Sequence, residues 1–299
     1  MLWRVSEPVI AARGLRKSYG DLDAVKGIDL EVHRGEIFAL LGPNGAGKTT
    51  TIEILEGFRA PSAGEVRVLG TDPLTGGRAF KERVGIVLQS VSVERFLTVE
   101  EVLELHRGYY PAPRPLDELL ELVGLSEQRK ARVGWLSGGQ QRRLDVALGL
   151  AGDPEVLFLD EPTTGFDPAA RRGAWDMVKG LRALGKTVML TTHYMDEAQE
   201  LADRVAIISA GRIVAQGPPA SLAGRDRGAT RITLRDPGEP LPEGLQHERV
   251  GQALEIVTAS PTRTLHALTS WALERGIELD LEVKRPSLED VYLELTGEA

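Results

Sequence analysis

A glycine-rich segment between an apolar run and a polar, helix-like stretch is the clearest chemical feature of the sequence. It matches the pattern G-x-x-x-x-G-K-[ST] with Gly42-Pro43-Asn44-Gly45-Ala46-Gly47-Lys48-Thr49, and it follows the apolar run Ile37–Leu41. Glycines let backbone amides close around phosphates, Lys48 supplies a positive charge, and the Thr49 hydroxyl can bind Mg²⁺. The segment therefore predicts a phosphate loop for a nucleotide, with Thr50 next in the helix that follows.

Two adjacent carboxylates follow another apolar run. Val156–Leu159 has the composition of a buried strand, and Asp160 and Glu161 come directly after it. Taken alone, such a pair can simply mark the entry into a solvated loop, because charged groups avoid burial without a partner. Beside a phosphate loop, Asp160 is expected to hold Mg²⁺ through its water shell. Glu161 is then expected to act as general base on the attacking water.

A serine and two glycines open a long predicted helix. Leu136-Ser137-Gly138-Gly139-Gln140 precedes a helix that we expect from about residue 140 to 151. Ser137 suits a helix cap, but glycine disfavours helix, so a simple cap does not account for Gly138 and Gly139. A hydroxyl and free amides at the positive end of a helix suit an anion. Because Lys48 already serves the phosphates, we expect a second subunit to fill this second anion site.

The composition is that of an ordinary globular protein. The chain has 299 residues, 42% hydrophobic and 27% charged, enough for one large or two ordinary domains with a buried core. It has no cysteine, which excludes disulfides, thiolate metal sites and cysteine nucleophiles. The formal charge of −8 argues against a chain-wide basic face for nucleic acid. The apolar runs are far shorter than the ~18–20 residues that cross a bilayer, and no secretory signal is apparent.

Apolar runs alternate with helical patterns in residues 1–217, which predicts an α/β domain with a mostly parallel sheet. Residues from about 95 to 150 have the pattern of an inserted helical subdomain, in which Thr98 and Glu101 match a capping box. Buried strands are expected at Ile37–Leu41, Val84–Leu88, Val156–Leu159 and Val188–Thr191, and half-exposed antiparallel strands at Ile28–Val32 and Glu65–Leu69.

The character of the sequence changes after residue 217. Residues 218–228 are expected to form a linker, and residues 229–299 have the pattern of a small α+β domain. The faultless alternation of Ile277–Val283 predicts a strand with one buried face. Further strands are expected at Arg231–Leu234 and Ala253–Val257, a helix at Thr262–Arg275, and a last helix in which Leu288, Val291, Tyr292 and Leu295 share one face.

Together the motifs resemble the nucleotide-binding subunits of ABC transporters. The phosphate loop, the segment Leu136–Gln140 and the strand ending in Asp160 and Glu161 occur in that family's order. The resemblance implies ATP and Mg²⁺ as ligands, bound by a P-loop ATPase fold that has a mostly parallel core sheet, an antiparallel β subdomain and an inserted helical subdomain. A small α+β domain, expected to serve regulation or dimerisation, follows it.

Further residues match lesser landmarks of the family. Tyr19 resembles the aromatic residue that stacks on adenine, Gln89 the glutamine that senses Mg²⁺ and the attacking water, and His193 the switch histidine at the γ-phosphate. Thr164-Gly165-Phe166-Asp167 resembles the loop whose Asp crosses the dimer interface, with Phe166 in place of the more common leucine. The resemblance thus assigns catalysis to Lys48, Gln89, Glu161 and His193, and the metal to Thr49, Gln89 and Asp160.

The resemblance implies an ATPase that works as a head-to-tail dimer of two copies, each nucleotide lying between Lys48 of one copy and Ser137–Gly139 of the other. It also implies separate transmembrane permease subunits that dock near Gln89 and the helical region, hence a peripheral position on the cytoplasmic face of the cell membrane. The segment 285–297 resembles the tail of daunorubicin-resistance-type bacterial exporter ATPases of drugs and lipids. This favours export, although import stays open.

Two other functions remain open on the sequence. One is a soluble ABC ATPase that acts on DNA or ribosomes, which the acidic balance and the lack of sustained heptads disfavour. The other is an adaptor whose C-terminal domain recognises a ligand while ATP switches it. His247 and His266 have no ligand-like partners in the sequence, and Trp271 lies on a helical face typical of a core.

Overall fold

The chain divides into two compact units, Met1–Gln216 and Gly217–Ala299. The computed structural model describes residues 8–87, 94–222, 230–242, 244–251 and 253–284, together with Leu288 and Tyr292. Each unit is considered by itself below.

A six-stranded sheet forms the centre of the first unit, in the order β5-β6-β7-β3-β8-β9. Its strands from β5 to β8 pair in parallel, and every residue of β3 and β7 is buried. Continuous apolar runs suit this position because both faces of the strands are covered. The predicted α/β class with a mostly parallel core sheet is therefore confirmed. The strands are β3 (Ile37–Leu41), β5 (Val84–Val87), β6 (Val156–Asp160), β7 (Thr187–Thr192), β8 (Arg204–Ser209) and β9 (Arg212–Gly217).

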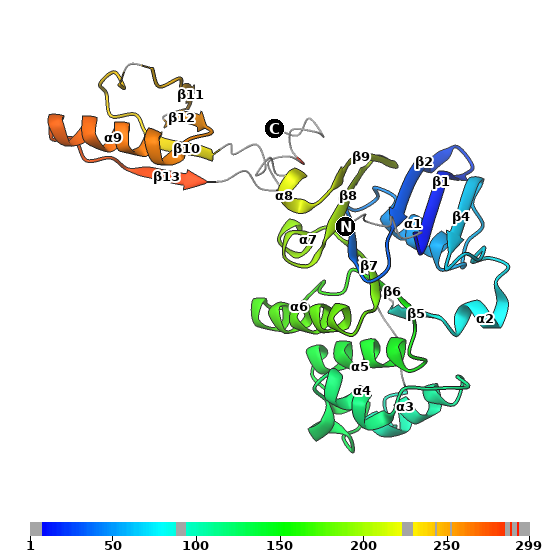
Figure 1. The fold of residues 1–299 in the computed structure, drawn as a ribbon. Coiled ribbons are helices and arrows are strands. Elements are labelled where there is room, and N and C mark those ends of the chain that lie inside the picture. Colours follow the sequence, from blue (N-terminus) through cyan, green and yellow to red (C-terminus); the bar gives the residue numbers. More distant parts are fainter. Residues whose placement is uncertain are drawn as a thin grey trace, which may run out of the picture. The chain divides into compact units, whose positions relative to one another are not determined.

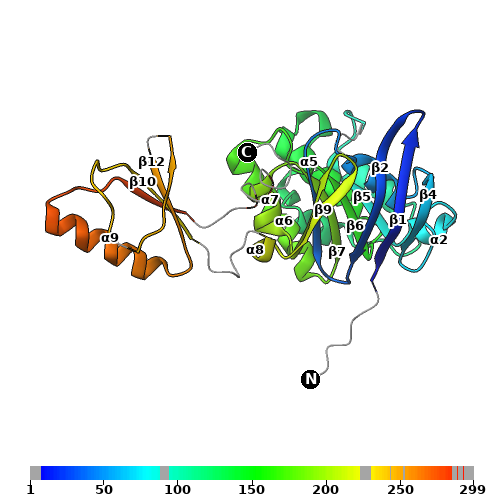
Figure 2. The same cartoon turned by 90° about the horizontal axis from the view of Figure 1, so that it is seen from above.

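A second sheet of three antiparallel strands, in the order β2-β1-β4, belongs to the same unit. Its strands are β1 (Ile10–Tyr19), β2 (Leu22–Val32) and β4 (Ala63–Val68), and the last two contain the expected antiparallel segments. Helix α1 (Lys48–Leu55) contacts β2 and β4 with one side and β6 and β7 with the other. Figures 1 and 2 show this sheet on the opposite side of the central sheet from the helices α6 (Pro168–Ala183) and α7 (Met195–Leu201).

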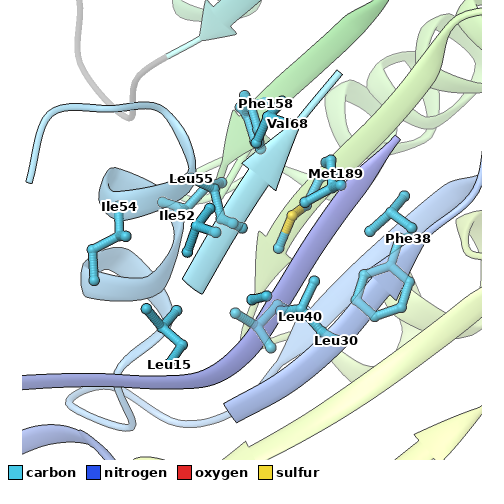
Figure 3. Packing of buried hydrophobic residues seen from close by; sticks show 14 of the residues in the cluster. Leu15, Leu30, Phe38, Leu40, Ile52, Ile54, Leu55, Val68, Phe158 and Met189 are labelled. Carbon is cyan, nitrogen blue, oxygen red and sulfur yellow. The ribbon is translucent and has the colours of Figure 1, made fainter. Parts of the chain in front are cut away.

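The main core fills the space that α1 spans between the two sheets (Figure 3). Ile52 and Leu55 of α1 are almost fully buried, as are Leu40 and Phe158 of the central sheet and Leu30 of the antiparallel sheet. Burying such side chains is worth roughly 1.5–3 kcal/mol each. Because α1 is fixed on both sides, its first residue Lys48 is held at a defined point over the central sheet.

Helices connect β5 to β6, as the sequence predicts for the inserted subdomain. They are α3 (Val99–Arg107), α4 (Leu116–Leu122) and α5 (Gly138–Leu150), with two 3₁₀ turns, η1 (Ser126–Gln128) and η2 (Val133–Trp135), between α4 and α5. Thr98 caps α3, and its side chain and that of Glu101 form the predicted capping box. Prolines separate α3 from α4, because each lacks an amide hydrogen. Helix α5 contacts β5, and α2 (Gly77–Lys81) precedes that strand.

The second unit is a four-stranded sheet, β11-β12-β10-β13, with one long helix. The apolar residues Ile232, Leu234, Leu254 and Ile256 of the sheet pack with Leu268 of the helix in a small core of their own. Leu288 and Tyr292 are helical and buried, whereas Val291 and Leu295 lie outside the described residues. The elements are α8 (Pro219–Leu222), β10 (Thr230–Arg235), β11 (Glu248–Val250), β12 (Ala253–Thr258), α9 (Pro261–Arg275) and β13 (Leu281–Lys284).

The strand expected over Ile277–Val283 is shorter than the alternation predicts. Only Leu281–Lys284 is β-strand, although Ile277, Leu279 and Leu281 are still the less exposed residues of the segment. The ladder to β10 starts where Leu281 pairs with Leu234, and the amide of Arg235 then donates to the carbonyl of Asp280. Since β10 ends at Arg235, earlier residues lie beyond the end of the partner strand. Alternation fixes the face of a residue but not the length of its partner strand.

Candidate nucleotide-binding and catalytic site

The phosphate loop connects the buried strand β3 to α1, as the sequence predicts. Gly45 and Gly47 have φ of 80° and 103°, in the left-handed region that favours glycine. A Cβ atom on Gly47 would lie 2.5 Å from the carbonyl oxygen of Ala24, and one on Gly42 would lie 2.3 Å from that of Ile208. Close backbone packing therefore requires Gly42 and Gly47, and the left-handed φ favours glycine at position 45. Pro43, Asn44, Gly45 and Thr49 are exposed, Gly47 and Thr50 are partly buried, and Gly42 and Ala46 are buried.

The ammonium group of Lys48 lies under this loop and is only 4% exposed. It donates to the carbonyl oxygens of Gly42 at 2.9 Å and Pro43 at 3.1 Å, and it lies 3.3 Å from Oε1 of Glu161. A buried cation at the N-terminus of a helix, directly below exposed glycine amides, provides charge and hydrogen-bond donors for a phosphate.

The acidic pair lies at the carboxyl end of β6 and is tied to the neighbouring strand β7. The hydroxyl of Thr191 donates to Oδ1 of Asp160 at 2.5 Å and accepts from the amide of Glu161 at 3.0 Å. Glu161 has φ of 45°, rare for a residue with a side chain. Such backbone strain often occurs at functional sites, where the surrounding structure maintains it. Thr191 therefore holds the carboxylate of Asp160 and the backbone of Glu161.

The two carboxylates of the pair differ in pKa. Burial raises the pKa of Asp160 above its ordinary value, although the hydrogen bond from Thr191 opposes the shift. Burial also acts to raise the pKa of Glu161, but Lys48, Thr164 and His193 outweigh it and leave this pKa below its ordinary value. Glu161 is therefore ionised at neutral pH and can accept a proton.

His193 follows β7 and lies beside the same carboxylate. Its Nδ1 atom is 3.3 Å from Oε2 of Glu161, and the hydroxyl of Thr164 donates to that oxygen at 3.1 Å. The fold thus brings together Lys48, Asp160, Glu161 and His193, which lie far apart in the sequence. A cation, an oxygen ligand, an ionised base and a titratable imidazole at one edge of a sheet can bind and hydrolyse a phosphate ester.

Tyr19 ends strand β1 with an aromatic ring that is 39% exposed. The Nζ atom of Lys17 lies 5.2 Å from the ring centre and the Cζ atom of Arg59 lies 5.6 Å from it. An exposed ring flanked by cations suits an electron-rich heterocycle. Gln89, the other residue expected at the nucleotide, lies outside the described residues.

The segment predicted as a second anion site caps α5. Ser137 is the N-cap, and its hydroxyl accepts from the amide of Gln140 while the Gln140 side chain accepts from the amide of Ser137. The helix begins at Gly138, two residues earlier than expected, and Ser137 and Gly138 are exposed. The described residues lining the adjoining pocket of about 300 Å³ come from α5, α6 and Phe166, and none is from the phosphate loop.

Asp167 caps α6. Its Oδ1 atom accepts from the amides of Ala169 at 2.8 Å and Ala170 at 2.9 Å. Thr164, Gly165 and Asp167 are exposed, and Phe166 is partly buried in the pocket beside Ser137. The loop and the start of α5 therefore form one surface.

Sequence reasoning missed three residues that support this site. Thr191 bonds the carboxylate of Asp160 and the amide of Glu161, and buried Arg142 donates to the carbonyls of Pro162 at 3.1 Å and Asp160 at 3.2 Å. Glu197 is fully buried and accepts from the hydroxyl of Thr163 at 2.8 Å. The two threonines before His193 were a usable signal, because a buried strand rarely ends in hydroxyls without a partner for them. Nothing local marks the role of Arg142, because the two carbonyls that it supports are about 20 residues away.

A cleft of about 460 Å³ lies elsewhere in the unit, and described residues of α2, β5, α3 and α5 line it. Glu56, the C-cap of α1, also lines it; this residue is 6% exposed, and neither carboxylate oxygen hydrogen-bonds to a described residue. Burial, reinforced by Asp160 and Glu53, raises the pKa of Glu56 to about 8. Asp145, also in the cleft, has its pKa raised to about 6 by burial. Phe58, Leu74, Phe80, Ile86 and Tyr110 provide apolar walls.

In the described part of the chain, no helix is long and apolar enough to cross a membrane. The same residues contain no group of three or more histidine, aspartate or glutamate side chains placed to hold a metal ion. A cation at the acidic pair would therefore depend on mixed ligands, including oxygens of a bound nucleotide.

Comparisons with known proteins agree with this arrangement. The family model for ABC transporters matches residues 25–164, and a model for the C-terminal domain of ABC transporter domain-containing-like proteins matches residues 233–287. A daunorubicin resistance ATP-binding protein of Streptomyces coeruleorubidus is 39% identical to this chain, and the match covers 98% of each. The Nod factor export ATP-binding protein I of Ralstonia nicotianae is 40% identical over 98% of this chain and 95% of its own.

Solved structures are similar over the greater part of the chain. One is cbiO1 from Clostridium perfringens, part of the ABC transporter complex cbiONQ, with a TM-score of 0.65, 28% identity, and coverage of 74% of this chain and 92% of that one. Another is a dimeric ATP-binding cassette in a post-hydrolysis state bound to ADP and Pi. Its TM-score is 0.62 at 25% identity, with 70% of this chain and 98% of that one covered.

Proposed function

The chain belongs to the ABC transporter family as an ATP-binding ATPase subunit, and from this premise we propose that it hydrolyses ATP as a head-to-tail dimer to drive export through separate membrane subunits. The observation that carries the proposal is the cluster of Lys48, Asp160, Glu161 and His193 at one edge of the central sheet. Relatives named for daunorubicin resistance and Nod factor export support a drug-like or lipid cargo.

ATP binds with its phosphates on the glycine-rich loop and its adenine on the exposed face of Tyr19. Lys48, which contacts the loop carbonyls and Glu161, supplies the positive charge next to the β- and γ-phosphates. Thr49 and Asp160 fit Mg²⁺, because both offer oxygen ligands and Thr49 is exposed at the start of α1. When bound, this ion neutralises charge on the phosphates.

Glu161 accepts a proton from the attacking water, since its pKa lies below the ordinary value and it is ionised at neutral pH. The hydroxyl of Thr164 and the amide tie to Thr191 fix its position. His193 contacts the γ-phosphate, and the contact with the water and the ion is assigned to Gln89, which follows β5 in the sequence.

The dimer places Ser137–Gly139 of one copy against the nucleotide bound to the other. Two observations support it: the helix end at Ser137 is exposed, and its pocket contains no described residue of the phosphate loop. The exposed loop Thr164–Asp167 borders the same surface and faces the second copy. ATP closes the dimer, and loss of the γ-phosphate opens it.

The membrane subunits dock at the cleft between β5 and the helical subdomain, and Gln89 follows β5 in the sequence. Its walls are largely apolar. Phe96 and Trp135 of the same subdomain are 78% and 75% exposed, unusual for rings that have no partner surface. Docking there brings this subunit to the cytoplasmic face of the membrane.

The second unit, from residue 218 to the C-terminus, stabilises or regulates the dimer. It has its own small core, and its helix and sheet are separate from the catalytic residues in the sequence. Truncation after Leu222 tests this role. Loss of dimerisation supports it, whereas retained dimerisation and ATP turnover with a lost response to cargo would favour a ligand-binding adaptor.

Glu161→Gln tests the proposed function most directly. With ATP, this variant should elute from a sizing column as a dimer, because assembly proceeds and hydrolysis does not. Lys48→Ala is the control that should remain monomeric, since it removes the phosphate-binding cation. An unchanged turnover rate in Glu161→Gln would contradict the role of Glu161. Failure of the chain to co-purify with any membrane protein from the membranes of its own cells would contradict the transport role.

A further inference from the structure

The first turn of α6 contacts the segment that carries His193. The guanidinium carbon of Arg171 lies 4.2 Å from the centre of the Tyr194 ring. The Tyr194 ring in turn lies 4.0 Å from the His193 ring, tilted by 40°. Arg171, Tyr194 and His193 thus form a continuous stack that leads from α6 to Glu161.

Hydrogen bonds to His193 do not explain its orientation. The Nδ1 atom is buried and lies 3.3 Å from Oε2 of Glu161, but it forms no hydrogen bond of acceptable geometry with a described residue. A histidine usually obtains its orientation from a partner at one ring nitrogen. Here the neighbouring ring supplies the nearest surface that can fix the imidazole plane.

Arg171 is itself held on several sides. Its side chain lies 3.3 Å from Oδ2 of Asp196, and its amide donates to the carbonyl of Asp167 at 2.9 Å. The residue that contacts Tyr194 is therefore held in place at the capped N-terminus of α6. A flat guanidinium stacked on a ring gives a defined orientation that a flexible ammonium group does not give.

Buried Glu197 anchors the other end of this contact. It accepts from Thr163 Oγ1 at 2.8 Å and from Trp175 Nε1 at 3.2 Å, so α7 is tied both to the segment after Glu161 and to α6. The backbone of Tyr194 is fixed as well, because its amide donates to the hydroxyl of Thr192 at 2.9 Å. The remaining freedom of the stack lies in the side chains.

We propose that Arg171 and Tyr194 are positioning residues, which set the plane of the His193 ring so that it meets the γ-phosphate and Glu161. Neither touches the nucleotide in this scheme. The proposal rests on the proposed function for the role of His193 and on the described contacts for everything else. It also couples the loop Thr164–Asp167 to the position of His193. A shift of Asp167 moves the backbone of Arg171, because the Arg171 amide donates a hydrogen bond to the Asp167 carbonyl.

The test compares ATP turnover of Arg171→Met and Tyr194→Leu with that of Arg172→Met. Arg172 is the exposed neighbour of Arg171, so its variant controls for loss of charge on α6. We expect a fall in kcat of about tenfold in the first two variants, with KM for ATP within about twofold, because misplacement of a catalytic group affects the transition state more than binding. Arg172→Met should keep the wild-type rate.

Conservative variants separate positioning from general damage to the fold. Tyr194→Phe keeps the stack and should recover most of the activity lost in Tyr194→Leu. Arg171→Lys keeps the charge but not the flat group, so it should recover less. Thermal unfolding midpoints of all variants show whether folding is affected. A loss of activity that follows the midpoint, or a Tyr194→Phe variant as slow as Tyr194→Leu, would overturn the proposal.

Combination with His193→Ala gives the decisive measurement. If Arg171 and Tyr194 act through His193, adding Arg171→Met to His193→Ala should lower kcat by less than about twofold further. An additive, tenfold further loss would show that Arg171 acts independently. If His193→Ala alone leaves turnover unchanged, the assigned role of His193 fails instead, so the two failures are distinguishable.

Discussion

Glu161 and Glu56 are two acidic residues of the same unit with opposite surroundings. Glu161 lies beside Lys48, His193 and the hydroxyl of Thr164, and its pKa is lowered. Glu56 ends α1 in a largely apolar cleft without a hydrogen-bond partner among the described residues, and its pKa is raised to about 8. A glutamate side chain is thus an ionised base at position 161 and a neutral acid at position 56.

The comparison of Glu161 with Glu56 shows that burial alone does not make a carboxylate catalytic. Burial raises the pKa of both residues, and only neighbouring cations and donors reverse this effect at Glu161. A strongly shifted pKa is a common sign of a functional site, yet the larger shift occurs at Glu56, which has no hydrogen-bond partner among the described residues. The constellation of neighbours therefore identifies the active site better than the size of a shift.

The largest contrast between the two regions should appear in ATP turnover. Glu161→Gln should lower kcat by about 10³-fold, because a general base contributes roughly 10²–10⁴-fold. Glu56→Gln should change the turnover of the subunit alone by less than about threefold, since this carboxyl is already neutral at pH 7. Steady-state phosphate release at saturating ATP measures both. Equal losses in the two variants would remove the distinction.

The dependence of stability on pH should show the reverse contrast. The folded-state pKa of Glu56 exceeds its ordinary value of 4.5, so the folded state holds an extra proton between pH 4.5 and about 8. The stabilisation is complete below pH 4.5, declines as the pH rises from there and is lost above about 8, with a total of roughly 5 kcal/mol. Glu56→Gln, which stays neutral, should flatten this slope in denaturant titrations at pH 5, 7 and 9. Glu121→Gln, at an exposed position of α4, should leave the slope unchanged.

Asp145 offers an intermediate case in the same cleft. Burial raises its pKa to about 6, while Arg142, whose NH1 atom lies 3.8 Å away, opposes the shift. Stability should therefore fall as the pH rises from the ordinary value of 3.8 through about 6. The total should be roughly 3 kcal/mol, and Asp145→Asn should remove it. A slope that persists in Asp145→Asn but disappears in Glu56→Gln would assign the whole effect to Glu56.

The smallest expected effect concerns the hydroxyl that joins the acidic pair. Thr191→Val removes the donor to Asp160 and the acceptor for the amide of Glu161. Turnover should fall by about tenfold, since one hydrogen bond to a charged group is worth roughly 1.5–3 kcal/mol. Thr187→Val is a matched control: it is buried in the same strand and loses a hydrogen bond to Gly35, but at the opposite end. Equal effects of both substitutions would indicate a loss of stability only.

Local patterns in the sequence were sufficient for much of the fold. Continuous apolar runs predicted β3, β6 and β7 because a strand covered on both faces needs apolar residues throughout. The capping box of Thr98 and Glu101 formed as predicted, since it depends on residues three positions apart. The left-handed φ of Gly45 and Gly47 is likewise a local need of the phosphate loop, whereas the close approach of Ala24 and Ile208 to this loop is not local.

Only the tertiary structure decided which distant groups meet. The salt bridge of Lys48 with Glu161, the hydrogen bonds of Thr191 to the acidic pair, and the stack of Arg171 on Tyr194 join residues from different strands and helices. It also decided the extent of β13, because a strand ends where its partner ends. The protonation of Glu56 belongs here too, since neutrality at pH 7 depends on the apolar walls that the fold gathers around it. Sequence determines the chemistry that is available, whereas packing determines distance and solvent exposure, on which pKa and reactivity depend.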